Sequence, residues 1–252
     1  METDLKIFDV VDSTNDTLEE LADKGAPEGT CVIAMSQRKG RGRSGRSFYS
    51  PDGGNLYMSL LLKPRSMKLC DLITIIAAVA TVEAVREVFG IDTGIKWVND
   101  IILDSKKICG IIATARNLES EDRYVILGIG MNIYESRFVP EDIRGKYGSV
   151  FGRSCDLSAD ESRDQVKVLA GTIIRRFSYY YEQAPAKEVI SQYRRYCIII
   201  GRQVEYMSGS DIISARVAGI DDNGGIVLDI NGALKTFRDG EIRINCDHMN
   251  LA

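Results

Sequence analysis

The residue types best suited to chemistry are concentrated in one polar segment, residues 40–46. It reads Gly-Arg-Gly-Arg-Ser-Gly-Arg, so three glycines and three arginines occur within seven positions. Glycine lets backbone N–H groups approach an anion closely, and the planar guanidinium of arginine matches the oxygens of phosphate and carboxylate. A segment of this composition does not form a core. We therefore expect a loop that binds phosphate or carboxylate.

A solvated basic loop and an RNA-binding Arg-Gly segment are the alternatives for residues 40–46. Arg-Gly segments that bind RNA are typically long and repetitive, whereas this one is short and lies between two apolar runs. The net charge of −4 also argues against a general nucleic-acid binder, which would usually be basic. A Walker loop is excluded because no Gly-Lys-Ser or Gly-Lys-Thr follows the glycines.

Two further clusters contain groups that could act with this loop. One comprises residues 96–100, Lys-Trp-Val-Asn-Asp, together with residues 106–110, Lys-Lys-Ile-Cys-Gly; alone, these would be interpreted as a surface hairpin with solvated lysines. The other is residues 128–132, Gly-Ile-Gly-Met-Asn. Glycines inside a strand indicate either a bulge or a group that approaches the backbone closely.

Several other kinds of chemistry are not expected. His248 is the only histidine, and the six cysteines are scattered without a C-x-x-C pair, so a zinc site or a Ser/His/Asp triad is improbable. The reaction must therefore use Lys, Arg, Asp and backbone N–H groups, and Mg²⁺ is a further candidate. The charged N-terminal residues lack the apolar core of a signal peptide, and no apolar run is long enough to span a membrane. We expect a cytoplasmic globular protein.

The helices and strands that must position these residues can be predicted from the periodicity of apolar residues and from capping, glycine and turn residues. We expect strands at residues 6–11, 31–37, 56–62, 94–98, 101–103, 107–115 and 124–133. Helices are expected from residue 13 or 14 to Gly25, over 71–89 up to Gly90, after a capping box at residues 158–161, and over 185–197. After Gly201 short alternating runs and the hairpin dipeptide Asn231-Gly232 predict a small β unit. We expect domains at residues 1–200 and 201–252.

Taken together, the chain resembles the biotin–protein ligases. The matching stretches agree in order and spacing and cover residues 11–15, 37, 40–51, 55–59, 96–100, 107–111 and 128–132. The tail from residue 201 to 244 is similar to the C-terminal SH3-like module of that family, with Gly240-Glu241-Ile242 in place. The Arg/Gly loop followed by Ser-Pro is the most specific of these motifs.

The resemblance implies an α+β fold: a mixed sheet flanked by helices, akin to class II aminoacyl-tRNA synthetases, plus a small SH3-like β-barrel. It also implies two steps. Biotin and ATP give biotinyl-5′-AMP and pyrophosphate, with Mg²⁺ carried by the ATP phosphates. A lysine of a biotin carboxyl carrier protein or domain then attacks the mixed anhydride.

The resemblance further assigns roles to individual residues. The implied biotin contacts are Ser13, Thr14, Asn15, Gln37, Gly40, Arg41, Gly42, Arg43, Lys107 and Gly110. The implied ATP contacts are Arg43, Arg46, Phe48, Lys96, Asn99, Lys107 and Asn132. The residues implied in catalysis are Lys107, Arg43 and Asp100. No protein ligand for a metal is assigned.

The sequence departs from the family at two positions: Phe48 stands where Trp is common, and Cys109 stands where a small residue is usual. Longer family members begin with a DNA-binding helix-turn-helix domain. Here the ligase motifs begin by residue 11, so we expect neither that domain nor DNA binding. Members of the family often form homodimers through sheet edges, so a homodimer is expected.

Three rival functions stay open. A lipoate or octanoate ligase or transferase is the nearest, because some use a Cys–Lys pair, and strand alternation would place Cys109 and Lys107 on one face. A non-catalytic regulator that binds biotin or its adenylate is the second. An RNA-binding protein is the third. Such proteins usually have a basic net charge or an aromatic-rich sheet motif, and this sequence has neither.

Overall fold

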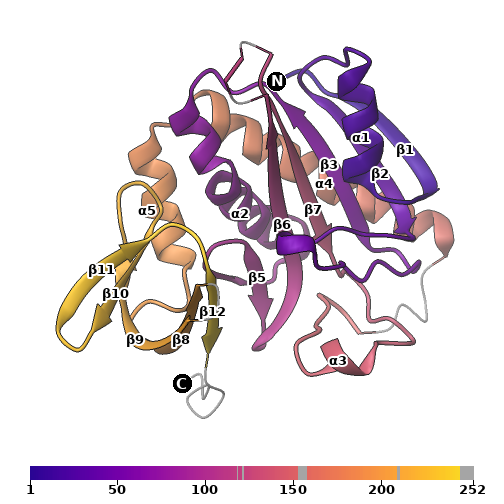
Figure 1. Ribbon diagram of the computed structural model, residues 1–252. Coiled ribbons are helices and arrows are strands. Elements are labelled where there is room, and N and C mark those ends of the chain that lie inside the picture. The colour runs from indigo at the N-terminus through magenta and orange to yellow at the C-terminus, as the bar shows by residue number, and fades with distance from the viewer. Residues whose placement is uncertain (118, 121, 153–157, 209–210, 245–252) are drawn as a thin grey trace.

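A seven-stranded mixed sheet forms the centre of the larger part of the molecule (Figure 1). In spatial order its strands are β1 (Asp4–Val11), β2 (Thr30–Gln37), β3 (Leu56–Leu62), β7 (Tyr124–Met131), β6 (Lys106–Arg116), β5 (Asp100–Leu103) and β4 (Gly94–Lys96). β1 and β2 are parallel, and the other neighbouring pairs are antiparallel. The predicted mixed sheet is confirmed.

The computed structural model describes residues 1–117, 119–120, 122–152, 158–208 and 211–244. Cys155, Cys246 and His248 lie outside these ranges. Within them, no helix combines the length and the apolar character needed to cross a membrane.

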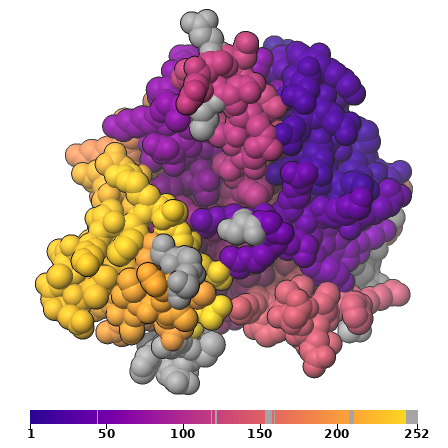
Figure 2. Space-filling view, viewed as in Figure 1, coloured from indigo at the N-terminus to yellow at the C-terminus, as the bar shows by residue number. Residues whose placement is uncertain are grey.

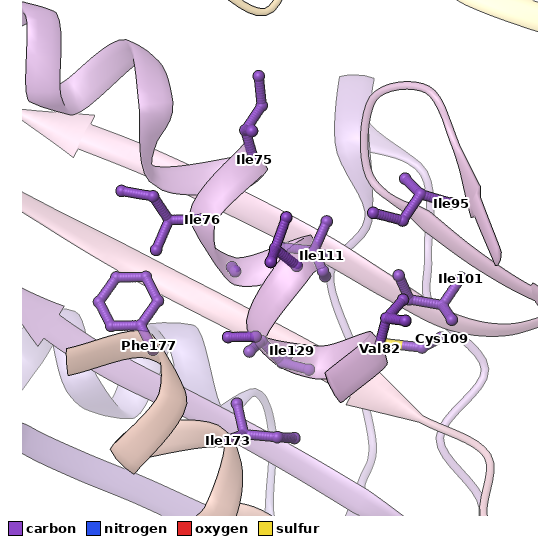
Figure 3. Close-up of a cluster of buried hydrophobic side chains, with 14 of the residues drawn as sticks. Ile75, Ile76, Val82, Ile95, Ile101, Cys109, Ile111, Ile129, Ile173 and Phe177 are labelled. Atoms are coloured by element: carbon purple, nitrogen blue, oxygen red, sulfur yellow. The ribbon is translucent and has the colours of Figure 1, made fainter. Parts of the chain in front are cut away.

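Helices pack on both faces of the sheet. α1 (Thr14–Asp23) covers one face through Leu18, which is fully buried against side chains of β2, β3 and β7. α2 (Met67–Phe89), α4 (Ala159–Glu182) and α5 (Ala186–Tyr196) cover the other face. Figure 3 shows Ile76 of α2 and Phe177 of α4 in the apolar cluster that also contains Ile111 and Ile129 of the sheet. The short helix α3 (Glu141–Arg144) and the 3₁₀ turn η1 (Arg43–Gly45) lie in connecting segments.

Capping residues set the helix ends. The predicted capping box begins α4: Glu161 N–H donates to Ser158 Oγ, and Ser158 N–H donates to Glu161 Oε2. Gly90, with φ of 71°, ends α2 as predicted. α2 begins at Met67 rather than residue 71, because the Ser66 hydroxyl accepts a hydrogen bond from Leu69 N–H and so caps an extra turn.

A second, antiparallel sheet follows α5. Its order is β11 (Ala233–Phe237), β10 (Ile226–Ile230), β9 (Asp211–Ile220), β8 (Gln203–Ser208) and β12 (Glu241–Ile244). Asn231 and Gly232 both have positive φ in the β10–β11 hairpin, as the dipeptide predicts. The Trp97 indole N–H donates to Gly224 O at 3.0 Å, and the inward side chains of the small sheet join the main apolar cluster. The domain boundary at residue 200 stays a prediction.

Candidate active site

A pocket lies where the loop between β2 and β3 crosses strands β6 and β7. Figure 1 shows η1 of this loop in front of β6, and Figure 2 shows the loop between the small sheet and the segment that carries α3. The lining residues are Ser13, Thr14, Asn15, Gln37, Arg41, Gly42, Arg43, Phe48, Tyr57, Met58, Asn99, Lys107, Gly110, Ile111, Ile112, Gly128, Ile129 and Gly130.

Most of the residues predicted from the sequence line this pocket. The structure brings together Ser13, Thr14, Asn15, Gln37, Arg41, Gly42, Arg43, Phe48, Asn99, Lys107 and Gly110. The remaining predicted residues, Gly40, Arg46, Lys96, Asp100 and Asn132, do not line it.

A polar network closes one end of the pocket. Gln37, at the end of β2, accepts hydrogen bonds at Oε1 from Thr14 N–H (2.8 Å) and Thr14 Oγ1 (3.1 Å), and donates from Nε2 to Ser50 Oγ (2.8 Å). Ser59 Oγ, buried on β3, lies 2.8 Å from Thr14 Oγ1 and 2.6 Å from Asn15 Oδ1. These bonds orient the amide and hydroxyl groups before any ligand binds.

The hydroxyl of Ser13 is not used to cap the helix that follows it. It is the N-cap of α1, yet its side chain makes no capping hydrogen bond. An N-cap serine usually accepts a hydrogen bond from the first helical turn. Ser13 is 1% exposed and lines the pocket, so its hydroxyl is placed to serve a ligand instead.

Each cation of the basic loop has a partner within the chain. Arg41 Nε lies 2.7 Å from Asp16 Oδ1, and Arg43 Nη1 donates to Asn99 Oδ1 at 3.1 Å. Arg46 donates from both terminal nitrogens to the Glu241 carboxylate of β12, at 2.8 and 3.3 Å. These hydrogen bonds hold the pKa of Glu241 below its usual range. Arg46 therefore joins the loop to the small sheet rather than lining the pocket.

Lys107 and Phe48 meet at the other end of the pocket. Lys107 Nζ lies 2.6 Å from Asp100 Oδ1 and 6.0 Å from the centre of the Phe48 ring. The ring lies against the paired glycines Gly110 and Gly130: a Cβ on Gly130 would be 2.5 Å from Phe48 Cε1. The close approach expected at residues 128–132 is thus made by a side chain of the protein itself.

The expectation that Cys109 and Lys107 share a face is wrong. The register between β5 and β6 shifts at this point: Ile101 pairs with Cys109, but the next residue, Ile102, pairs with Lys107, so one residue of β6 is skipped. This bulge breaks the alternation of a regular strand. Cys109 is fully buried in the apolar cluster (Figure 3), and burial raises the pKa of its thiol. Lys107 instead shares the pocket side with Gly110, whose Cβ would lie 3.1 Å from Lys107 Nζ.

The other predicted residues have different positions. A Cβ on Gly40 would lie 2.4 Å from Phe48 O, so glycine permits the tight return of the loop. Burial lowers the pKa of Lys96 on β4. Asn132 is 5% exposed and donates from Nδ2 to Gly148 O at 2.9 Å, while its Oδ1 is buried with no hydrogen-bond partner among the described residues.

Sequence reasoning assigned no role to Ser59 or to the apolar lining. Ser59 lies in an otherwise apolar strand, and a lone hydroxyl there is the signal that could have identified it. The apolar lining residues Met58, Ile111, Ile112 and Ile129 resemble ordinary core residues, so their types alone do not distinguish pocket from core.

Comparisons with known proteins agree with this site. Residues 7–132 match the biotin/lipoate A/B protein ligase family model. The bifunctional ligase/repressor BirA of Bacillus subtilis is 33% identical over 242 residues, covering 94% of this chain and 72% of the relative. The biotin–[acetyl-CoA-carboxylase] ligase of Mycobacterium tuberculosis is 24% identical, covering 93% and 88%. The biotin protein ligase of Aquifex aeolicus, solved with biotin and ATP, has a TM-score of 0.76 and 25% identity, covering 96% and 98%.

Proposed function

Because the chain belongs to the biotin/lipoate A/B protein ligase family, we propose that it activates biotin with ATP and transfers it to a lysine of a biotin carboxyl carrier protein or domain. The observation that carries this proposal is the pocket itself. One end holds preorganised hydroxyl and amide groups, and the other holds Lys107 beside the arginine loop. A carboxylic acid with a polar ring at its far end fits that arrangement.

In the first step a biotin carboxylate oxygen attacks the α-phosphorus of ATP, the bond from that phosphorus to the bridging oxygen breaks, and pyrophosphate leaves. Carboxylate and phosphate repel each other, so cations must hold both in line. Lys107 lies in the pocket at the strand end, and Arg43 approaches from the loop. We assign these two residues to that task.

At the far end, the ureido ring needs partners for two N–H donors and one carbonyl. Burying such a ring without hydrogen bonds would cost a few kcal/mol. The Ser13 hydroxyl, which does not cap α1, is the first candidate, with Thr14 and Asn15 beside it. Gln37 acts mainly by orienting Thr14, since its Oε1 already accepts two hydrogen bonds. Gly40 and Gly42 give the loop its tight course, and Arg41 reaches from the loop to Asp16 of α1.

For the nucleotide we propose Arg46, Asn99, Lys96, Phe48 and Asn132. The unpartnered Asn132 Oδ1 is a buried acceptor that an adenine amino group would satisfy. Mg²⁺ would enter with the ATP phosphates. The Asp100 carboxylate beside Lys107 fits an ion that is held by phosphates, waters and one or two carboxylates.

In the second step the carrier lysine amine attacks the carbonyl carbon of the anhydride, the bond from that carbon to the phosphate oxygen breaks, AMP leaves, and the amine proton passes to a carboxylate or to water. We propose Asp100 as the group nearest this step, because it is the carboxylate next to Lys107. A cytoplasmic location, the absence of DNA binding and the SH3-like form of the small sheet stay predictions. A homodimer also stays a prediction; edge strand β1 exposes Leu5, Ile7, Phe8 and Val10.

The test is exchange of labelled pyrophosphate into ATP, run with biotin, lipoate and octanoate. We expect exchange with biotin and Mg²⁺ and at least about 10⁴-fold less with the other acids, which would leave the pocket's polar groups unpaired. Exchange with lipoate but not biotin would overturn the substrate assignment. Saturable biotin binding without exchange would indicate a binding regulator. The buried thiol of Cys109 disfavours the transferase that uses a Cys–Lys pair.

A further inference from the structure

A short segment, residues 146–148, lies beside Lys107. At this position β6 no longer pairs with β7, because their ladder ends at Cys109 and Met131. Lys107 N–H donates to Lys146 O at 2.8 Å, and Gly148 N–H donates to Lys107 O at 2.9 Å. Lys107 and Tyr147 thus form an isolated parallel bridge. We call residues 146–148 the strap. It binds both backbone polar groups of the residue that we assign to catalysis.

Asn132 joins the strap to the sheet. Its N–H donates to Ile108 O at 2.8 Å, and its C=O accepts from Val150 N–H at 3.0 Å. Its side-chain Nδ2 donates to Gly148 O at 2.9 Å, and the residue is 5% exposed. One asparagine therefore contacts three places: β6 at Ile108, one residue beyond Lys107; the strap at Gly148; and Val150, two residues beyond the strap.

The packing around Gly148 leaves no space for a side chain. A Cβ built there would lie 2.6 Å from Lys106 Cβ and 3.3 Å from Ile108 Cγ2, so a larger residue would push the strap away from β6. The bulge adds to the need for this support, because the regular pairing with β5 is interrupted between Ile101 and Ile102, opposite Lys107 and Cys109.

From these contacts we propose that Asn132 is a positioning residue for Lys107, acting through the strap. The inference rests on the proposed function and deepens it. Lys107 must hold carboxylate and phosphate together, and a misplacement of about 1 Å in such a group can cost on the order of 10²-fold in rate. The backbone under Lys107 is fixed by the strap, and the strap is fixed by the Asn132 amide.

The test compares Asn132→Asp with Gly148→Ala in biotin-dependent pyrophosphate exchange. Asn132→Asp keeps the size of the side chain but replaces the donor to Gly148 O with a carboxylate oxygen. Gly148→Ala displaces the strap while the Asn132 side chain itself stays unaltered. We expect both variants to lower kcat by about 10- to 100-fold, with KM for biotin changed less than about threefold. For Gly148→Ala, which keeps the Asn132 acceptor proposed for adenine, KM for ATP should also change less than about threefold. Ser149→Ala is the matched control, since its hydroxyl bonds Phe151 O and not Lys107; it should keep wild-type kcat.

A direct role in nucleotide binding alone would give a different result. Asn132→Asp would then raise KM for ATP, while Gly148→Ala would leave kcat unchanged, and the proposal would be overturned. Equal kcat in all variants and wild type would also overturn it. A circular dichroism melt of each variant checks folding, and loss of kcat together with a wild-type melt supports positioning. If the wild-type protein shows no exchange with biotin, the failure belongs to the proposed function instead.

Discussion

Lys107→Ala separates catalysis from stability, because the structure predicts a large effect on one and a small effect on the other. The Lys107 and Asp100 side chains are 36% and 22% exposed, and ion pairs this accessible contribute about 0–1 kcal/mol to folding. In the reaction, a preorganised cation aimed at developing phosphate charge contributes roughly 10²–10³ in rate. We therefore expect exchange to fall by about that factor while the free energy of unfolding changes by less than about 1 kcal/mol.

The assay is pyrophosphate exchange at saturating biotin and ATP, paired with urea denaturation of the same preparation. Lys106→Ala is the matched control, because Lys106 is the preceding residue of β6, is exposed and does not line the pocket. Its exchange rate should stay within about twofold of wild type. Near-normal exchange by Lys107→Ala, with an unchanged fold, would refute the assignment of Lys107 to the reacting groups.

Three further results are expected. Gly130→Ala should weaken biotin-dependent exchange by displacing the Phe48 ring, so it should cause no further loss in a chain that already carries Phe48→Ala; lower exchange in the double variant than in Phe48→Ala alone would contradict this. Cys109→Ser should keep most activity, because the thiol is buried away from the pocket; complete loss of transfer would favour the transferase. Glu241→Gln should lower the free energy of unfolding, measured by urea denaturation, at pH 7. This difference from wild type should fade as the pH falls below about 4.5, because Arg46 lowers the pKa of Glu241 in the folded state. A difference that stays constant down to pH 3 would contradict this reasoning.

The sequence predicted the elements well where a local rule decides them. Strand β3 has the predicted bounds, and the capping box at Ser158 begins α4 where expected. The early start of α2 was missed because Ser66 precedes a mixed segment with no apolar periodicity. The bulge at Lys107 was also missed: alternation assumes an uninterrupted ladder, and only the pairing with β5 shows that the ladder is interrupted.

The site was predictable to the extent that its residue types are unusual. Arginines and glycines in the loop indicated anion binding, whereas contacts to the biotin ring were implied only by the resemblance to the family. The partners that hold them were not predictable, because they are distant in sequence: Glu241 lies 195 positions from Arg46, and Gly148 lies on a strap with no strand pattern. Such contacts depend on how two sheets and a connecting segment pack, which no local pattern specifies.

The pairing of each loop cation with an internal partner bears on how a ligand could engage the loop. The Arg41–Asp16 and Arg46–Glu241 pairs involve side chains that are 52% and 32%, and 62% and 34%, exposed, so water screens them and each contributes about 0–1 kcal/mol. The same charge-assisted hydrogen bonds from arginine to a phosphate or carboxylate become stronger where a bound ligand excludes water. An arriving carboxylate and triphosphate can therefore replace the internal acids at little cost. Under the proposed function, the substrates would therefore take the place of Asp16 and Glu241 as partners of Arg41 and Arg46.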